Sequence, residues 1–328
     1  MAAGSAVALE SLLHSLAPDL QRVEAEVARM VATDSEPVRG YLNHLSQFGG
    51  KRLRPALVLL AGRMYDGITA QHDAVAAIVE MIHLATLVHD DILDESAMRR
   101  GVETVNRKVG NETAVLLGDY LFATAFREAA RLEDRFPSEH LSDVVTIVCH
   151  GEMKQVHHRN DLEMSEKIYF EIIEGKTAAL YAAALRCGAR LAGAPEDEAE
   201  ALARFGMSFG SAFQIVDDIL DLTGEEGIVG KSLGTDLDKA KMTLPLLRLR
   251  DKATAADRAK LEDAIRSHDP KARERVRPLL EEYGAIESAR ETADELVAQA
   301  RDELHRVPAS ADRDLLQQAA EFVLSRDR

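Results

Sequence analysis

The stretch that decides the fold runs from Ala74 to Asp94 and reads AVAAIVEMIHLATLVHDDILD. A helix built from it has almost no polar face before Asp90, so we expect it at the centre of the molecule. A second apolar stretch, from about Leu202 to Asp221, ends in the same five letters, DDILD. Because no strand-length alternation bounded by turn residues occurs in the sequence, we predict an all-α fold, a bundle of many helices around a central apolar cavity.

The pentapeptide DDILD occupies residues 90–94 and 217–221. On a helix its first and last aspartates share one face, where like charges repel, and each copy falls where an apolar helix should end, beside the negative end of the dipole. A chain that carries this cost twice is expected to hold a hard divalent cation between the copies. Oxygen ligands without nearby His or Cys favour Mg²⁺, which completes its shell with water and substrate phosphate. The alternative is two ordinary helix ends with solvated carboxylates.

The composition favours one helical domain that does not bind nucleic acid. The 328 residues contain no Pro/Gly/Ser-rich linker or charge block, and the two DDILD copies need one another. We therefore predict a single domain, residues 1–328, with residues 1–48 as its N-terminal helical segment. The net charge of −16 argues against a nucleic-acid partner, which would be bound by neutralising its phosphates.

Cysteine usage and the N-terminus bear on the compartment. Cys149 and Cys187 are too few for a disulfide framework, and both are expected to be buried thiols. The N-terminus carries Glu10 and lacks a basic segment followed by an apolar core, so no signal peptide is expected. No apolar run reaches the roughly 18 residues that a membrane span needs. We therefore expect no transmembrane segment and a cytoplasmic protein.

Basic residues stand beside breaks in the chain at several places. Such groups are expected if the acidic site binds a diphosphate, because Arg binds phosphate with two hydrogen bonds and Lys acts as a point charge. Each of them alone is more often a solvated surface charge. The candidates are Lys51, Arg52 and Arg54 after Gly49-Gly50, Arg99 and Arg100 before Gly101, Lys176 after Gly175, Lys231 after Gly230, and Lys239 and Lys241 before Thr243-Leu244-Pro245.

Two glycine-containing segments do not form nucleotide motifs. Gly175-Lys176-Thr177 lacks the first glycine of a Walker A loop, because Phe170 stands in its place. Gly206 and Gly210 lie four residues apart on the second apolar stretch. We interpret this pair as permitting close helix packing or room in the cavity.

Histidines raise two further questions. His83 precedes Asp90 by seven residues, two helical turns on the same face, and both a core histidine and a site histidine stay open. Glu152 and His157-His158 suggest a metal site, but adjacent histidines cannot share a helix face. We therefore assign no metal to them.

Taken together, these residues resemble the all-trans polyprenyl diphosphate synthases over roughly Gly49 to Arg250. One departure from the family pattern is visible: where these enzymes usually have Glu-Gly-Lys, this chain has Lys239-Ala240-Lys241. The lysine keeps its register, while the local shape of the loop differs. The matching motifs, in order, are Gly49-Gly50-Lys51-Arg52-Leu53-Arg54-Pro55, His83, the first DDILD with Arg99-Arg100-Gly101, Gly118-Asp119-Tyr120, Gly175-Lys176-Thr177-Ala178, Phe213-Gln214 with the second DDILD, and Gly230-Lys231 through Gly234-Thr235-Asp236 to Thr243-Leu244-Pro245.

The resemblance implies an Mg²⁺-dependent prenyltransferase that joins isopentenyl diphosphate to an allylic diphosphate such as farnesyl diphosphate, acting as a homodimer. It implies the following roles. Asp90, Asp91, Asp94, Asp217 and Asp221 would bind metal, with Asp218 in support; Arg99, Lys176, Thr177, Gln214, Lys231 and Lys241 would lie at the allylic diphosphate or its reacting carbons; Lys51, Arg54, His83 and Arg100 would bind isopentenyl diphosphate.

Product length is expected to depend on the apolar stretch before Asp90. In this family, aromatic residues four and five positions before the first aspartate mark short-chain enzymes, and here those positions are Thr86 and Ala85. Ile82, Met81 and Ile78 come below them. Each helical turn of about 5.4 Å admits roughly one more isoprene unit. The chain thus resembles the octaprenyl type, with products of about 30–50 carbons and about 40 as the central expectation, used for quinone side chains.

Three alternatives stay open. A medium-chain synthase, which makes geranylgeranyl or farnesylgeranyl diphosphate, differs only in its product. A terpene cyclase lacks the isopentenyl-binding basic residues that this chain has at Lys51, Arg54 and Arg100. A non-catalytic subunit of a heteromeric synthase tends to lose its aspartate motifs, whereas both are intact here.

Overall fold

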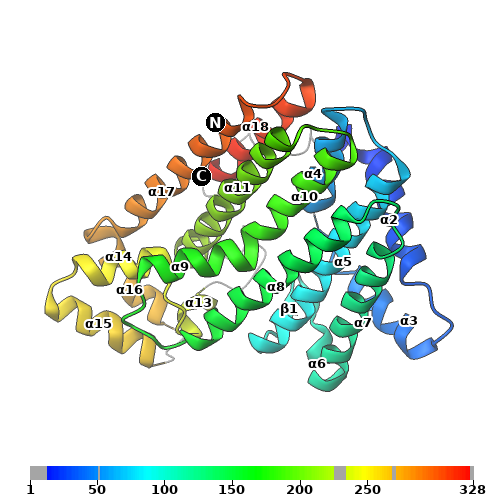
Figure 1. Ribbon diagram of the computed structural model, residues 1–328. Coiled ribbons are helices and arrows are strands. Elements are labelled where there is room, and N and C mark those ends of the chain that lie inside the picture. Colours follow the sequence, from blue (N-terminus) through cyan, green and yellow to red (C-terminus); the bar gives the residue numbers. More distant parts are fainter. Residues whose placement is uncertain (1–12, 51, 225–233, 268–270, 326–328) are drawn as a thin grey trace.

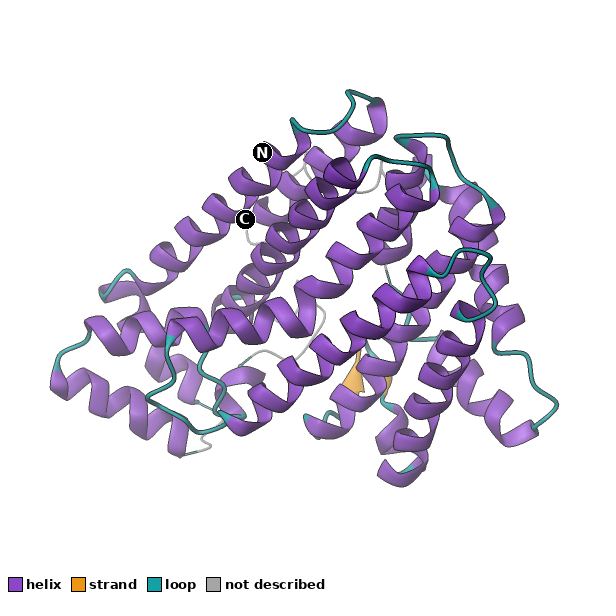
Figure 2. Ribbon diagram, in the orientation of Figure 1, coloured by secondary structure: helices purple, strands orange, loops and turns teal. Residues whose placement is uncertain are grey.

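The computed structural model describes residues 13–50, 52–224, 234–267 and 271–325. The described chain is nearly all helix (Figure 1, Figure 2), which confirms the all-α prediction. Lys51 and Lys231 lie outside the described residues, so their roles stay predictions. In chain order the elements are α2 (Ala17–Met30), α3 (Glu36–Ser46), α4 (Leu53–Arg63), α5 (Ala70–Leu93), β1 (Met98–Arg99), β2 (Val102–Glu103), α6 (Val105–Val109), α7 (Asn111–Ala129), α8 (Phe136–His157), α9 (Glu166–Ile173), the π-helical segment η1 (Glu174–Ala178), α10 (Ala179–Leu191), α11 (Glu196–Thr223), α13 (Thr235–Asp238), α14 (Leu244–Lys252), α15 (Ala255–Arg266), α16 (Ala272–Glu282), α17 (Ala285–Leu304) and α18 (Ala311–Ser325).

Helix α5 lies at the centre of the bundle, with α2, α4, α7 and α10 packed against it (Figure 1). Most of its residues between Val75 and Val88 are buried, as expected for a stretch without a polar face. The helix begins after Thr69, whose backbone N–H donates to Nδ1 of His72 at 3.1 Å. It ends at Leu93, so the first DDILD lies at its C-terminal end, as predicted.

Helix α11 carries the second DDILD and is longer than predicted, because it begins at Glu196 rather than near Leu202. Pro195 precedes it, and its first turn holds three acidic residues, which stabilise the positive end of the helix dipole. It packs against both α10 and α17. A Cβ atom on Gly206 or Gly210 would lie 2.7 or 2.6 Å from the Cα atom of a facing alanine. These glycines therefore permit close helix packing, one of the two interpretations of the sequence.

A short antiparallel hairpin follows α5, in which Arg99 pairs with Val102. Arg100 and Gly101 form its turn with φ angles of 52° and 79°, the left-handed conformations that a tight two-residue hairpin turn requires. The sequence did not predict these strands, because strands of two residues are too short to show an alternating pattern.

The single-domain prediction is supported by one apolar core cluster that extends from Leu16 to Val323 in α18, and it stays a prediction. The prediction for the cysteines is half wrong. Cys187 is buried, but Cys149 on α8 is exposed, because it follows the buried Val148 and lies on a face that the core does not cover. In the described part of the chain, no helix is long and apolar enough to cross a membrane.

Candidate active site

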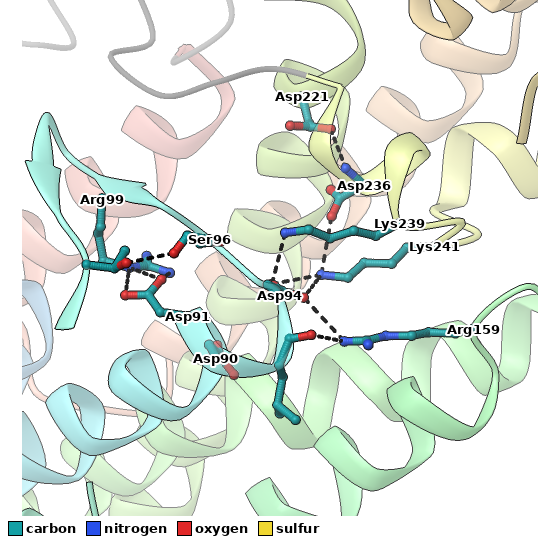
Figure 3. Close-up of polar contacts among 12 residues, drawn as sticks. Asp90, Asp91, Asp94, Ser96, Arg99, Arg159, Asp221, Asp236, Lys239 and Lys241 are labelled. Atoms are coloured by element: carbon teal, nitrogen blue, oxygen red, sulfur yellow. Dashed lines mark hydrogen bonds and ion pairs between the residues drawn. The ribbon is translucent and has the colours of Figure 1, made fainter. Parts of the chain in front are cut away.

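Asp91, the middle aspartate of the first copy, pairs with Arg99 rather than with the partners of Asp90 and Asp94. Asp91 is buried, and its carboxylate accepts hydrogen bonds from Arg99, with Oδ1 2.7 Å from Nη2 and 2.9 Å from Nε (Figure 3). Burial raises the pKa of Asp91, and the Arg99 guanidinium opposes that shift. Since Asp91 is one residue, or about 100°, around the helix from Asp90, this ion pair ties the β1 hairpin to the end of α5.

Asp90 faces a lysine and a second carboxylate. The Nζ atom of Lys176 lies 3.3 Å from Asp90 and 2.6 Å from Oε1 of Glu152 on α8. Burial would lower the pKa of Lys176, but Asp90 and Glu152 outweigh burial and the net pKa is raised, so the ammonium stays charged. Burial, with the Asp90 carboxylate next, raises the pKa of Glu152 to about 7, against the opposing effect of Lys176.

An irregular segment presents Lys176 and Thr177 to this site. Both belong to η1, a π-helical turn between α9 and α10, and such turns are frequent at functional sites. Two glycines let α8 approach it closely: a Cβ atom on Gly151 would lie 2.7 Å from the backbone nitrogen of Lys176, and one on Gly175 would lie 3.1 Å from a carbonyl of α8. The backbone contact between α8 and η1 therefore sets the position of the lysine.

Asp94, the last residue of the first copy, faces three cations (Figure 3). Nζ of Lys241 lies 3.1 Å from the Asp94 carboxylate, Nη2 of Arg159 lies 3.4 Å away, and Nζ of Lys239 lies 3.8 Å away. Burial opposes ionisation of Asp94, but Lys241 and Lys239 outweigh it and lower the pKa of the carboxyl. Asp94 is therefore ionised and surrounded by positive charge.

Asp218, the middle aspartate of the second copy, has uncharged hydrogen-bond donors. The carboxylate of the buried Asp218 accepts hydrogen bonds from the Tyr169 hydroxyl at 2.7 Å and from the Gln214 side-chain amide at 2.8 Å. The Gln214 carbonyl accepts the Thr177 hydroxyl at 2.9 Å. This chain of hydrogen bonds joins η1, α11 and α9, and it fixes Gln214 and Thr177 side by side, as their predicted shared role requires. Asp217 precedes Asp218 and is half-buried.

A short chain of contacts links the two copies. Lys241 lies 3.6 Å from Asp236 as well as 3.1 Å from Asp94, and the Asp236 backbone N–H donates to Oδ2 of Asp221 at 3.0 Å (Figure 3). No group of three acidic, His or Cys side chains is preassembled as a metal site within the described residues. The side-chain ligands that the two copies offer are all carboxylate oxygens, a donor set that fits a hard divalent cation.

The predicted isopentenyl-binding residues that the structure describes lie close together. The Arg54 guanidinium stacks on the Tyr181 ring at 4.2 Å and donates through Nη1 to Nε2 of His83 at 3.1 Å. Burial, and then the charges of Arg54 and Arg100, lower the pKa of His83 well below its usual value. The ring is therefore neutral, with Nε2 as acceptor, because arginine only donates. Arg100 donates to the backbone carbonyl of Gly49, beside the predicted Gly49-Gly50 break.

The comparison with known proteins decides the family. A model of the polyprenyl synthetase family matches residues 35–283. The chain belongs to this family. It is 34% identical to the octaprenyl diphosphate synthase of Escherichia coli over 98% of this chain and 99% of that protein. It is also 36% identical to heptaprenyl diphosphate synthase component 2 of Geobacillus stearothermophilus, over 97% and 99%.

The fold comparison agrees. A crystal structure of a polyprenyl synthase from Caulobacter crescentus, complexed with calcium and isoprenyl diphosphate, is similar to this chain with a TM-score of 0.93 and 33% identity over 98% of both chains. The family match confirms the prediction of a prenyltransferase-type enzyme. The structural match confirms that the fold is the all-α fold of polyprenyl synthases.

The residues predicted to set product length lie along α5, on the N-terminal side of its aspartates. Ala85 is fully buried in an apolar cluster that α5 shares with α7. Thr86 is half-buried, and its hydroxyl donates to a backbone carbonyl one turn back at 2.8 Å. Ile78, Met81 and Ile82 are fully buried in the main core. Their effect on product length stays a prediction within this family.

Several residues of the site were missed or set aside at the level of sequence. Glu152 was set aside because spacing along its own helix gave no metal pattern, and it contacts Lys176 from another helix. The contact between Tyr169 and Asp218 spans 49 residues, so no local motif reveals it. Lys239 and Arg159 reach Asp94 from two loops. Lys239 was among the basic candidates of the sequence, but no role in the site was assigned to it.

Proposed function

We propose that this chain condenses isopentenyl diphosphate head-to-tail onto an allylic diphosphate such as farnesyl diphosphate, and that it makes an all-trans polyprenyl diphosphate of about 30–50 carbons, with about 40 as the central expectation. The observation that carries the proposal is the pair of DDILD copies linked through Lys241 and Asp236, with Lys176 and the Thr177–Gln214 pair beside them. This arrangement suits a reaction that releases a highly charged leaving group.

The metal Mg²⁺ would be held by Asp90, Asp91, Asp94, Asp217 and Asp221, with Asp218 in support, and the oxygen-only donor set supports this assignment. Bound there, Mg²⁺ would supply charge stabilisation for the diphosphate as the allylic bond breaks. Lys176, Lys241 and Arg99 bind the same diphosphate, and Lys231 is assigned to it by the family resemblance. Titration with Mg²⁺ after EDTA treatment tests the metal: activity is lost with EDTA and restored by Mg²⁺.

The chain's own groups then guide the carbocation. The Thr177 hydroxyl and the Gln214 amide present dipoles beside the reacting carbons, which stabilise positive charge without forming a bond to it. Arg54, His83 and Arg100, together with Lys51, hold isopentenyl diphosphate so that its double bond meets the cation. Nε2 of the neutral His83 ring accepts a hydrogen bond from Arg54 and so holds that guanidinium in place. The released diphosphate accepts the proton, so the site needs no separate protein base.

Product length is tested by one substitution on α5. Ala85→Phe places a ring about one turn from Asp90, where the growing tail is proposed to pass, and displacing a close-packed wall costs roughly 1–3 kcal/mol. Incubation with Mg²⁺, labelled isopentenyl diphosphate and farnesyl diphosphate is expected to give wild-type products of about 30 carbons or more and variant products of about 15–20 carbons. Ala70→Phe, on the exposed first turn of the same helix, is the matched control and should not shorten the product. Identical distributions from wild type and Ala85→Phe would remove α5 from the tail path.

We also propose a homodimer in the cytoplasm that supplies quinone side chains. Exposed large apolar side chains of the described part gather on α7 and α8, namely Val115, Leu116, Ile147, Met153 and Val156, and a second copy of the chain would cover them. Because one relative is named as a component of a synthase, a heteromer is the competing assembly. Light scattering of the purified chain decides between them: a dimer that Leu116→Glu and Met153→Glu dissociate supports the homodimer, and an inactive monomer supports the heteromer.

A further inference from the structure

More positive charge surrounds Asp94 than one carboxylate neutralises. Lys241, Lys239 and Arg159 all lie within 4 Å of it, at 3.1, 3.8 and 3.4 Å (Figure 3). Asp236 lies 3.6 Å from Lys241, and its charge also acts on Lys239, so two carboxylates face three cations. The excess positive charge lies beside Asp94, where an anion is the expected ligand.

Arg159 is held so that its guanidinium stays at this point. Its Nη2 donates to the backbone carbonyl of Leu93 at 2.9 Å, besides facing Asp94. Its Nε is buried without a hydrogen-bond partner among the described residues. The loop that follows Arg159 is held in place by Arg250, which donates to the backbone carbonyls of Leu162 and Met164 at 2.8 and 2.7 Å. The guanidinium thus has donor capacity that Asp94 alone does not use.

Lys239 is brought to the same point by an unusual backbone conformation. The residue after it, Ala240, has a φ of 50°, a left-handed conformation that disfavours any residue with a Cβ atom. Its carbonyl accepts the backbone N–H of Asn160 at 3.2 Å, so the loop of Lys239 and the loop of Arg159 are joined directly. This hydrogen bond therefore fixes the segments that carry Arg159 and Lys239 relative to each other.

We propose that Arg159 and Lys239 are two further diphosphate-binding residues of the allylic site, held by Asp94 while the site is empty and turned to the diphosphate once a metal ion takes the Asp94 carboxylate. The proposal rests on the proposed function and adds to it two cations outside the family motifs. Lys239 stands where the family usually has glutamate, so this site carries two more units of positive charge at that position than the family pattern does. A tighter hold on the leaving group is the expected consequence.

The competing explanation is that both cations only neutralise Asp94 and support its position. The two explanations predict opposite changes in Mg²⁺ affinity when the cations are removed. If Arg159 and Lys239 compete with metal for Asp94, their removal leaves Mg²⁺ binding unchanged or tighter and weakens diphosphate binding. If they only position Asp94, their removal weakens Mg²⁺ binding and leaves the diphosphate contacts of the other cations in place.

Calorimetry on the purified full-length chain tests this with inorganic diphosphate as the probe. Arg159→Gln and Lys239→Gln are each expected to weaken diphosphate binding in the presence of Mg²⁺ by about five- to twenty-fold, since each loses one partly exposed charge-assisted contact. Lys239→Glu should weaken it further. Titration with Mg²⁺ alone should give equal or tighter binding in all three variants. In turnover, KM for the allylic diphosphate should rise and KM for isopentenyl diphosphate should stay unchanged.

Arg131→Gln and Lys167→Gln are the matched controls, because their side chains are 64% and 86% exposed on other surfaces. Both should bind diphosphate as the wild type does. The proposal is overturned if Arg159→Gln and Lys239→Gln bind diphosphate within two-fold of the wild type, if they bind Mg²⁺ more weakly, or if the wild type binds no diphosphate. A wild type that binds diphosphate as expected but makes no polyprenyl product would contradict the proposed function and leave this inference standing.

Discussion

The two DDILD copies have the same five residues at the ends of two long helices, yet their middle aspartates, Asp91 and Asp218, have partners of different kinds among the described residues. In the first copy, Asp90 faces Lys176, Asp91 pairs with Arg99, and Asp94 faces three cations. In the second, Asp218 accepts hydrogen bonds from the uncharged Tyr169 and Gln214. Cations neutralise the carboxylates they touch. Asp218 instead has neutral donors, and burial followed by the charge of Asp236 raises its pKa well above its ordinary value.

This difference shows that a local motif fixes the spacing of its side chains but not their partners. Both copies end a buried helix, and both space their outer aspartates by one helical turn. The partners lie 4 to 147 residues away along the chain. If the proposed function holds, the cations of the first copy are expected to turn to the substrate diphosphate, whereas Tyr169 and Gln214 hold the Asp218 carboxylate in place.

The largest expected effect comes from removing one aspartate of either copy. Asp90→Ala and Asp217→Ala should each lower kcat by a factor on the order of 10² or more, because each takes a ligand from a site that works by charge stabilisation. Steady-state kinetics with Mg²⁺ in excess measures this, with circular dichroism to show that the chain stays folded. Near-wild-type turnover in either variant would mean that its copy does not hold the metal, and the comparison would reduce to one active copy.

A smaller effect is expected from removing a single cation of the first copy. Lys176→Gln loses the charge that bridges Asp90 and Glu152, a contact worth about 1.5–3 kcal/mol, so kcat/KM for the allylic substrate should fall by roughly 10- to 100-fold. Arg100→Gln should mainly raise KM for isopentenyl diphosphate. The exposed Lys167→Gln is the control. If Lys176→Gln and Arg100→Gln affected both substrates equally, the separate assignment of the two diphosphate sites would be wrong.

The sequence predicted the parts of this picture that depend on neighbours along the chain. The all-α fold, the central helix and both acidic helix ends follow from periodicity and from the repeat. The contacts of Glu152 and Tyr169 were missed because they join separate helices, and periodicity within one helix carries no information about a partner on another. The π-helical turn at Lys176 was missed as well, because it arises where Gly151 and Gly175 let two backbones meet.

The second copy offers a test of stability rather than of catalysis. Tyr169→Phe removes the hydroxyl that donates to the buried Asp218 at 2.7 Å, which leaves one carboxylate oxygen with fewer donors and should lower the free energy of unfolding by about 1–3 kcal/mol. Urea denaturation measures the change. Tyr120→Phe on α7, a half-buried tyrosine without a hydrogen bond in the described part, is the control. An unchanged midpoint for Tyr169→Phe would show that Asp218 does not need its neutral donor.

The smallest expected effect comes from a residue at the other end of α5, far from both DDILD copies, and it tests whether ligand binding depends only on the C-terminal ends of the helices. His72 lies at the opposite end of α5, fully buried, where Nδ1 accepts from Thr69 and Nε2 donates to the Gly188 carbonyl at 3.0 Å. His72→Gln should lower the free energy of unfolding at neutral pH by about 1–2 kcal/mol through these hydrogen bonds. Diphosphate and Mg²⁺ binding at both DDILD copies should stay unchanged.

The pKa of His72 determines how its contribution to stability changes with pH. Burial lowers the pKa of His72 below its ordinary value of 6.5, although the Gly188 carbonyl opposes the shift. The folded protein therefore favours the neutral ring, and the stability that His72 contributes is full above pH 6.5 and is lost as the pH falls toward its folded pKa. The difference in stability between wild type and His72→Gln, measured by urea denaturation, should accordingly shrink as the pH is lowered from neutral to about 5. The exposed His150→Gln should show no such difference at any pH. A wild-type advantage that grew on acidification would mean that His72 is charged in the folded state, so that Nδ1 would be a donor rather than an acceptor.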